Sequence, residues 1–342
     1  MSKFPDTLVQ ENVDLQPYNT LNISASARYF ATVETKAELK KLLICLDSEP
    51  LLVLGGGSNV LFADDFEGLV LHVGIRGKQV IEETDEHIWL KVGAGENWHQ
   101  TVRYCVKQGW GGIENLSLIP GTVGAAPIQN IGAYGVELKE VFQWLEAVSV
   151  DTSEVKRFEK KDCQFGYRDS IFKGELRGKY VITNVVLKLS KHAVVNTSYG
   201  AIRSELESRG IEDPSIREIS DIVVDIRNSK LPNPETLGNA GSFFKNPIVD
   251  KEIYQHIKND YLDVPGYQVD ENSVKIPAGW LIEQAGWKGK VVGNVGTYEQ
   301  QALVIVNHGG ANGSEILQLA KNIRESVKEQ FGIALVPEVN IV

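Results

Sequence analysis

The sequence predicts a mixed α+β protein built of more than one domain. The first third joins a helical stripe of leucines at 39–46 to an apolar, strand-like run at 51–54. The middle third, residues 142–189, alternates apolar and polar residues as strands do. A long helical pattern at 314–330 lies near the C-terminus. With 342 residues, the chain can form two or three domains and a substantial core.

Two helices are predicted in the first third. Thr35–Glu38 has the pattern of a capping box, in which a threonine and a glutamate pair with the first amides of a helix. Four leucines between 39 and 46 then fall on one helical face, and the apolar run at 51–54 follows as a strand. The second helix is predicted over Asn97–Gln108, because Gly109 is a natural residue to end it.

The middle third is rich in predicted strands, at 145–150 and 180–187, with Arg168 in the loop between them. A helix is predicted over Ser215–Asn228. We place a domain boundary at Leu231–Pro234, because the residue before a proline is pushed out of helical geometry. Beyond it, the patterns predict a glycine-rich turn at 238–241, a helix at 278–285, a strand at 302–306, a helix at 314–330 and a strand at 334–336.

The composition is that of an ordinary globular protein, with 42% hydrophobic and 23% charged residues. The formal net charge of −10 argues against non-specific binding to nucleic acid or to an anionic membrane. Cys45, Cys105 and Cys163 form no C-x-x-C pair, so neither a disulfide framework nor a zinc site is supported, and a reducing cytoplasm fits best. No basic segment precedes an apolar stretch at the N-terminus, and no run approaches the ~20 apolar residues of a bilayer span. We expect neither export nor a membrane span.

The most informative segment is Ile119–Glu137. It holds four glycines and two prolines and, before its last residue, no ionisable side chain except Tyr134. Glycine lets backbone N–H groups approach a ligand closely, and successive N–H groups form an anion-binding concavity without a positive side chain. A pyrophosphate group would fit such an anion-binding concavity. Taken alone, the segment is equally well explained as a tight, irregular connection.

A second glycine-rich loop, Gly55–Asn59, favours the ligand interpretation. It lies between strand-like runs at 51–54 and 60–62, whereas the G-x-G-x-x-G dinucleotide fingerprint needs a helix to begin at the loop. Neither G-x-x-x-x-G-K-[ST] nor H-E-x-x-H occurs in the chain. Two anion-compatible loops without either fingerprint suggest a different dinucleotide-binding fold.

Three residues are candidates for chemistry. Ser242 lies between the glycine-rich run 238–241 and two phenylalanines, so we expect its hydroxyl to be exposed yet partly shielded. It lacks the G-x-S-x-G elbow and a neighbouring histidine, and the alternative is a serine that caps a turn. If Arg168 is buried, its guanidinium suits bidentate binding of a substrate carboxylate. If it is exposed, an ordinary surface ion pair is the alternative. Glu338 lies among apolar residues, either on the solvent face of a strand or placed for function.

Five separated motifs occur in order along the chain: Leu54–Asn59, Ile119–Gly135, Tyr167–Ser170, Gly238–Pro247 and Pro337–Val339. Together they resemble the UDP-N-acetylenolpyruvoylglucosamine reductase family, over a stretch from about Tyr18 to the C-terminus, and Tyr199 matches the tyrosine-bearing insertion of its first type. The resemblance implies an FAD-binding fold of the vanillyl-alcohol oxidase type plus a smaller α+β substrate-binding domain. The implied divisions are a first FAD subdomain at 1–75 with 312–342, a second at 76–228, and the substrate domain at 229–311.

The resemblance also implies the reaction, in which the enolpyruvyl double bond of UDP-N-acetylglucosamine enolpyruvate is reduced to UDP-N-acetylmuramate for peptidoglycan synthesis. NADPH is the implied hydride donor, and FAD is non-covalent, because neither loop contains a histidine or cysteine. A hydride from flavin N5 adds to C3 of the enolpyruvyl group, Ser242 delivers a proton to C2, and Arg168 and Glu338 stabilise the enolate.

The family's binding residues carry over by matching motif. The implied cofactor-binding residues are Gly55, Gly56, Gly57, Ser58, Asn59, Pro120, Gly121, Thr122, Gly124, Ala125, Ile131, Gly132, Ala133 and Tyr134. The implied substrate-binding residues, with the diphosphate as their target, are Tyr199, Lys230, Asn246 and Gln301. No metal is implied, and we expect a cytoplasmic monomer acting on a small molecule.

Two alternatives stay open. One is a flavin oxidase or dehydrogenase of the wider vanillyl-alcohol oxidase group, against which the Ser242 and Glu338 motifs speak. The other is a non-catalytic protein that binds a UDP-sugar or nucleotide through the glycine-rich loops. Flavin absorption and its response to oxygen distinguish the three possibilities.

Overall fold

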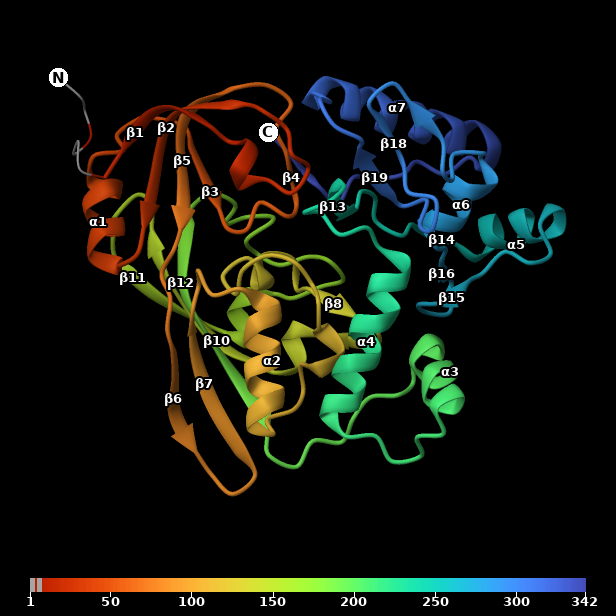
Figure 1. Ribbon diagram of the computed structural model, residues 1–342, viewed down its shortest axis with the longest axis horizontal. Helices are drawn as coiled ribbons and strands as arrows, with labels where there is room; N and C mark the ends of the chain where they lie inside the picture. The colour runs from red at the N-terminus through yellow and green to blue at the C-terminus, as the bar shows by residue number, and fades with distance from the viewer. Residues whose placement is uncertain (1–3, 5–7) are drawn as a thin grey trace. The chain divides into compact units, whose positions relative to one another are not determined.

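The computed structural model describes Phe4 and residues 8–342 (Figure 1). The chain divides into two compact units. The first unit comprises Met1–Val13, Ala27–Gly56 and Phe66–Arg227, and the second comprises Asp14–Ser26, Gly57–Asp65 and Asn228–Val342. The prediction that the N-terminus carries no export segment falls in part on residues 1–3 and 5–7, which lie outside the described residues.

The first unit begins with a four-stranded sheet in which the predicted helix and strand are confirmed. The sheet has the order β1 (Gln10–Asp14), β2 (Ser26–Val33), β5 (Phe66–Val73), β3 (Leu51–Leu54). Strands β2, β5 and β3 are parallel, so the chain needs a crossover between β2 and β3, and α1 (Lys36–Ile44) supplies it. Thr35 and Glu38 form the predicted capping box.

A five-stranded antiparallel sheet accounts for the predicted strand-rich middle third. Its order is β11 (Val155–Glu159), β10 (Phe142–Ser149), β12 (Tyr180–Ser190), β7 (His87–Gly93), β6 (Lys78–Glu83). Helix α2 (Trp98–Gln108) shares one hydrophobic core with both sheets. Asn97 caps its first turn and Gly109 ends it at φ 79°, as predicted. A small hairpin, β8 (Gly132–Ala133) and β9 (Val136–Glu137), lies in the glycine-rich segment.

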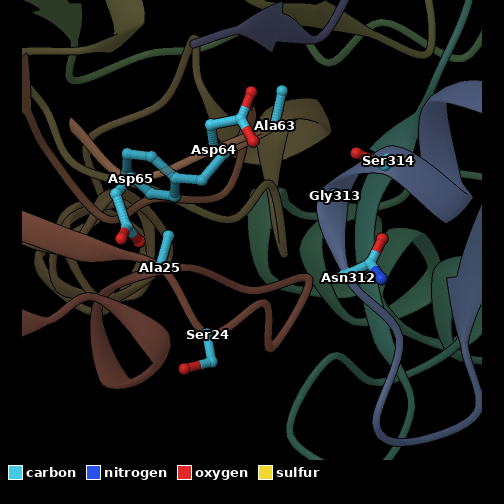
Figure 2. A pocket seen from close by; sticks show the side chains of 9 residues that line it. Ser24, Ala25, Ala63, Asp64, Asp65, Asn312, Gly313 and Ser314 are labelled. Carbon is cyan, nitrogen blue, oxygen red and sulfur yellow. The ribbon is translucent and has the colours of Figure 1, made fainter.

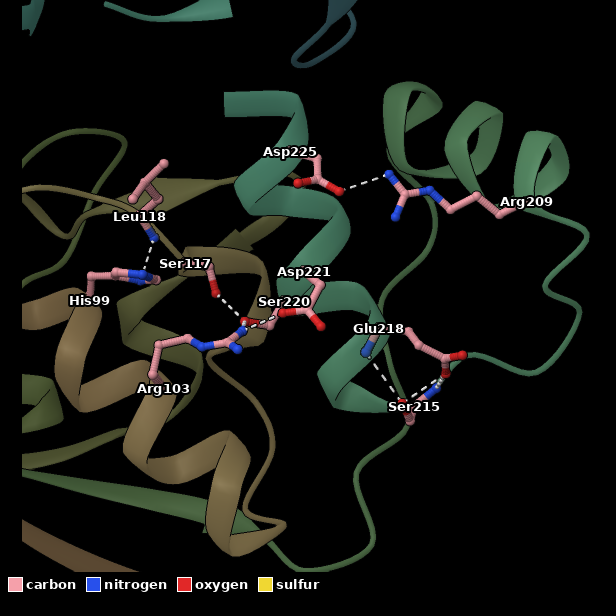
Figure 3. Close-up of polar contacts among 10 residues, drawn as sticks. All are labelled: His99, Arg103, Ser117, Leu118, Arg209, Ser215, Glu218, Ser220, Asp221 and Asp225. Atoms are coloured by element: carbon pink, nitrogen blue, oxygen red, sulfur yellow. Dashed lines mark hydrogen bonds and ion pairs between the residues drawn. The ribbon is translucent and has the colours of Figure 1, made fainter. Parts of the chain in front are cut away.

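Two helices complete the first unit. Helix α3 (Gly200–Arg209) packs on α4 (Ile216–Lys230) through a small apolar core. Their outer faces are joined by an ion pair of 2.9 Å between Arg209 and Asp225 (Figure 3). Helix α4 confirms the helix predicted near 215–228, and its last residues, 228–230, belong to the second unit.

The second unit contains two small antiparallel sheets. One has the order β13 (Gly238–Ser242), β19 (Val304–Asn307), β18 (Val295–Thr297), β17 (Val291–Val292), and the other β14 (Ile248–Asp250), β16 (Ser273–Lys275), β15 (Tyr267–Gln268). Strands β20 (Asn340–Ile341) and β4 (Val60–Leu61) form a short parallel pair. The helices are α5 (Lys251–Asp260), α6 (Ala278–Gln284) and α7 (Gly313–Phe331).

Two of the predicted elements in this unit are wrong. The glycine-rich run 238–241 forms strand β13 rather than a turn, and a bulge that includes Gly241, at φ 67°, interrupts its pairing with β19. Glycine is needed at Gly238 because a Cβ there would lie 2.6 Å from the Leu21 carbonyl oxygen. The predicted strand at 334–336 does not form. Pro337 makes only an isolated bridge to Phe244, since proline has no N–H with which to extend a ladder.

The division into three parts at 1–75 with 312–342, 76–228 and 229–311 stays a prediction. No helix in the described part of the chain is both long and apolar enough to cross a bilayer.

Candidate active site

Gly55 and Gly56 of the first glycine-rich loop meet the second loop within the first unit. A Cβ on Gly56 would lie 3.0 Å from the Gly121 Cα, and one on Gly55 would lie 2.5 Å from Thr122 Oγ1. The backbones of the two loops therefore pack directly on each other, and any residue larger than glycine at Gly55 or Gly56 would collide with the second loop. No hydrogen bond within the described part of the chain uses the backbone N–H of Gly56, Gly121 or Thr122. A cradle of uncommitted amides without side chains fits the pyrophosphate of FAD.

Two side chains, one within the glycine-rich segment and one outside it, hold the segment in shape. Asn130 is buried at φ 44°, and its Oδ1 accepts a hydrogen bond from the Lys139 N–H at 2.9 Å. Its Nδ2 donates to the Gly166 carbonyl at 3.0 Å. Ser170 Oγ donates to the Ile128 carbonyl at 2.6 Å. These bonds tie the segment to Lys139, Gly166 and Ser170, which follow it in the chain, and none of them uses a glycine of the segment.

Arg168 occupies a strained turn beside this segment. The N–H of Gly166 donates to the Asp169 carbonyl at 3.0 Å, which places Arg168 inside the turn at φ 53°. A non-glycine residue in the left-handed region costs energy and is found where the surroundings over-determine it, often at functional sites. Arg168 Nη1 lies 3.2 Å from where a Cβ on Gly132 would be. The absence of a side chain at Gly132 therefore leaves room for the guanidinium. Arg168 is half-buried, which lies between the fully buried and the exposed side chain that the sequence analysis left open.

Arg227 is a cation near this site that the sequence analysis missed. Its Nε donates to the Leu118 carbonyl at 3.2 Å, and its guanidinium hydrogen-bonds the Tyr134 side chain. Burial lowers the pKa of Arg227, and repulsion from Arg168 lowers it further. No ion pair among the described residues involves Arg227. Two neighbouring guanidiniums, one without a carboxylate partner, favour an anion close by.

Tyr134 connects this cation to a predicted substrate residue. Its ring meets that of Tyr199 edge to face, with centroids 5.1 Å apart. Burial raises the pKa of Tyr134, so its hydroxyl stays protonated and can donate a hydrogen bond. The signal for Arg227 was available in the sequence, because this arginine lies four residues after Val223 and next to Ile226, two buried apolar positions of helix α4.

In the second unit, the structure brings Ser242 and Glu338 onto adjacent backbone segments. The Glu338 N–H donates to the Phe243 carbonyl at 2.8 Å, and Ser242 pairs with Val304 in the sheet. Phe243 and Phe244 are buried, and Ser242 is partly exposed beside them. The partial exposure of the residue as a whole agrees with the expected exposed but shielded hydroxyl. Neither Ser242 nor Glu338 is on a long strand, since the bulge and Pro337 end the pairing.

Three more predicted residues, Asn59, Asn246 and Gln301, make contacts within the second unit. Asn59 Nδ2 donates to the Glu338 carbonyl at 3.4 Å, which ties the first loop to the C-terminal segment. Asn246 Oδ1 accepts from the Ala278 N–H at 2.9 Å and so caps helix α6 from a distance. Gln301 lies in the turn before β19, with Oε1 2.7 Å from where a Cβ on Gly279 would be.

The other predicted residues have simple environments. Gly57 requires glycine, because φ is 59° and a Cβ would lie 1.9 Å from the Tyr18 carbonyl oxygen. Ser58, Gly124, Ile131 and Ala133 are partly buried, whereas Pro120, Ala125 and Lys230 are exposed.

A polar pocket of about 350 Å³ in the second unit contains none of the predicted residues (Figure 2). It opens beside the first turn of α7, where Asn312 caps the helix, and is lined in part by Asp64 and Asp65. Asp65 accepts a hydrogen bond from the Ser26 N–H at 2.6 Å. Two carboxylates would repel a diphosphate, so this pocket does not suit FAD or a UDP-sugar.

The three cysteines are free thiols. Burial raises the pKa of Cys105 and of Cys163 to about 12, so both are protonated and poorly reactive.

Comparison with known proteins decides the family. Residues 27–159 match the FAD binding domain, and residues 233–342 match the C-terminal domain of UDP-N-acetylenolpyruvoylglucosamine reductase. A reductase of that name from Amoebophilus asiaticus is 52% identical over 98% of this chain and 99% of its own length. The chain belongs to the UDP-N-acetylenolpyruvoylglucosamine reductase family. A Pseudomonas aeruginosa reductase of that name is 44% identical over 97% of this chain and 98% of its own.

Solved structures confirm the fold of this FAD-dependent oxidoreductase. The UDP-N-acetylenolpyruvylglucosamine reductase of Thermus caldophilus superimposes with a TM-score of 0.69 at 24% identity, over 97% of this chain and 98% of that one. p-Cresol methylhydroxylase superimposes with a TM-score of 0.52 at 12% identity, over 99% of this chain and 87% of that one. The reductase family member described here therefore has the predicted α+β, vanillyl-alcohol oxidase type of FAD-binding fold.

Proposed function

We propose that the protein reduces the enolpyruvyl double bond of UDP-N-acetylglucosamine enolpyruvate with electrons from NADPH, in the cytoplasm, to give UDP-N-acetylmuramate. The observation that carries the proposal is the placement of Ser242 and Glu338 on adjacent backbone segments. The names of full-length relatives at 44–52% identity support the choice of substrate.

Residues of the glycine-rich loops would hold FAD, with backbone amides at Gly56, Gly121 and Thr122 directed to its pyrophosphate. FAD, when bound, supplies the hydride that adds to C3 of the enolpyruvyl group, after accepting one from NADPH. Protein side chains then have two tasks. They must stabilise negative charge that spreads from C2 into the substrate carboxylate, and they must deliver a proton to C2.

Arg168 is assigned to the carboxylate, because a guanidinium binds it bidentately and its strained turn fixes the group in advance. Glu338 assists in its protonated form, as a hydrogen-bond donor to the enolate oxygen. Ser242 donates the proton to C2. A serine hydroxyl is a weak acid, so this transfer needs the strong basicity of the carbanion and local stabilisation of the resulting alkoxide.

The diphosphate of the substrate is assigned to Tyr199, Lys230, Asn246 and Gln301. Lys230 is exposed, as a cation that meets a solvated phosphate can be, and Tyr199 is 46% exposed. Asn246 also caps helix α6, so its replacement would disturb the fold as well as binding.

Anaerobic mixing tests the function as a whole. Addition of NADPH is expected to bleach flavin absorption at about 450 nm, and subsequent addition of the enolpyruvyl substrate is expected to restore it. Rapid reoxidation by oxygen without substrate would instead indicate an oxidase. A purified protein with no such absorption, and none after FAD is added, would indicate a binding protein and contradict the proposal.

Replacement of Glu338 with glutamine tests the role of its proton. If Glu338 only donates a hydrogen bond, the amide should retain activity within about tenfold, whereas Glu338→Ala should lose about 10²–10³-fold. The measurement is the single-turnover rate of flavin reoxidation by substrate. A glutamine variant as inactive as the alanine variant would show that the proton itself must move.

A further inference from the structure

Side chains of helices α2 and α4 hold the three residues that precede the glycine-rich segment, Leu116–Leu118. Figure 3 shows the contacts of Ser117 with Ser220 and of Leu118 with His99. Trp98 Nε1 donates to the Leu116 carbonyl at 2.9 Å. Ser117 Oγ lies 2.8 Å from Ser220 Oγ, and both serines are fully buried. We call these contacts, with the two at Leu118, the polar clamp.

Leu118 is gripped at both of its backbone polar groups. Its N–H donates to Nδ1 of His99 at 2.9 Å, and its carbonyl accepts from Arg227 Nε at 3.2 Å. Its φ of 57° is unusual for a residue with a side chain, so the conformation depends on the clamp. The orientation of this residue sets the direction in which the chain enters Pro120–Ala125.

The bond to His99 fixes the state of the imidazole. Nδ1 must carry a lone pair to accept from an N–H, so the ring is neutral with its proton on Nε2. The groups that act on the ring favour this form. His99 lies in the first turn of α2, where the helix dipole opposes a cation, and Arg103 on its own helix and Arg227 from α4 add positive charge. Burial, followed by these two charges, lowers the pKa of His99.

Two further titratable groups near the clamp are already paired. Asp221, on α4, is bound to Arg103 at 2.6 Å, and the Tyr134 hydroxyl is bound to Arg227. Neither the Asp221 carboxylate nor the Tyr134 hydroxyl is therefore available to hydrogen-bond the His99 imidazole in place of the Leu118 N–H.

We propose that His99 is a positioning residue that, as a neutral imidazole, holds Leu118 and thereby the start of the FAD-binding segment. The proposal rests on the proposed function, because it takes Pro120–Ala125 as part of the FAD site. Protonation of His99 converts Nδ1 from an acceptor into a donor, and two N–H groups then face each other. FAD affinity is therefore full when His99 is neutral and falls as the pH drops through its lowered pKa.

Three variants of the full-length protein test this, with the dissociation constant of FAD measured by quenching of flavin fluorescence. His99→Asn places Oδ1 where Nδ1 lies and cannot be protonated, whereas His99→Leu removes the acceptor. His192→Asn makes the same exchange at an exposed histidine of the same unit. As the pH is lowered from about 7.5 to below the lowered pKa of His99, wild type and His192→Asn should lose affinity about threefold to tenfold more than His99→Asn. His99→Leu should bind about tenfold more weakly than wild type at the higher pH.

Hydrogen exchange separates failure of this proposal from failure of the site assignment. FAD should slow exchange of the backbone amides of Gly121 and Thr122 in wild-type protein, because neither donates a hydrogen bond within the described part of the chain. Absence of that protection overturns the assignment of the FAD site, and this proposal with it. Protection together with the same pH profile in wild type and His99→Asn overturns the role of His99 alone, even where His99→Leu does not fold.

Discussion

Replacement of Ser242 with alanine is expected to slow reduction of the enolpyruvyl substrate by about 10²–10⁴-fold, the usual contribution of a positioned acid. Reduction of FAD by NADPH should stay within about twofold of wild type, because no proton reaches C2 in that half-reaction. Rapid mixing under anaerobic conditions measures the two half-reactions separately.

The matched control is Ser314→Ala, at an exposed serine of the same unit. It should leave both rates unchanged. Ser242 lies at the bulge of β13 beside two buried phenylalanines, so alanine fits without loss of packing. Equal loss in both half-reactions of the Ser242 variant would show that the residue serves the flavin site as a whole, and the proton-donor role would then be wrong.

Arg168→Lys is the second substitution with a large expected effect. Lysine keeps the charge but cannot bind a carboxylate through two parallel N–H groups, so we expect a loss of about 10²–10³-fold in kcat. KM for the enolpyruvyl substrate should rise less than kcat falls, because the guanidinium stabilises the enolate more than the ground state. Steady-state kinetics with saturating NADPH give both constants.

Arg209→Lys is the control, since Arg209 makes surface ion pairs with Glu205 and Asp225. Exposed pairs of this kind contribute about 0–1 kcal/mol, and activity should not change. Because both residues at 168 carry Cβ, the left-handed turn is equally strained in wild type and variant. Activity of Arg168→Lys within about twofold of wild type would mean that charge alone suffices, and the bidentate role would be wrong.

Elements with local signals were predictable from the sequence. Helix α1 begins at a capping box, and α2 runs from Asn97 to Gly109, because caps are set by residues within one turn of the helix end. Strand β13 was missed because a run with two glycines resembles a turn. What makes it a strand is its pairing with β19, a contact between residues far apart in the chain.

The site was predictable in identity more than in geometry. Motif resemblance selected Ser242 and Glu338, but nothing in their spacing shows that backbone hydrogen bonding joins Phe243 to Glu338. Arg227 was missed because a single arginine on a predicted helix is usually exposed. Its contacts with Leu118 and Tyr134, at opposite ends of the glycine-rich segment, exist only once the chain has folded.

Through those contacts, Arg227 links two parts of a loop whose glycine residues have little conformational preference of their own. A glycine-rich loop left to itself would sample many shapes, and each arriving cofactor would have to wait for the right one. Because the Arg227 guanidinium hydrogen-bonds both Leu118 and Tyr134, the loop is held in one conformation before any ligand binds. Capture of the cofactor then depends on how often the two molecules collide, and little on how fast the polypeptide rearranges.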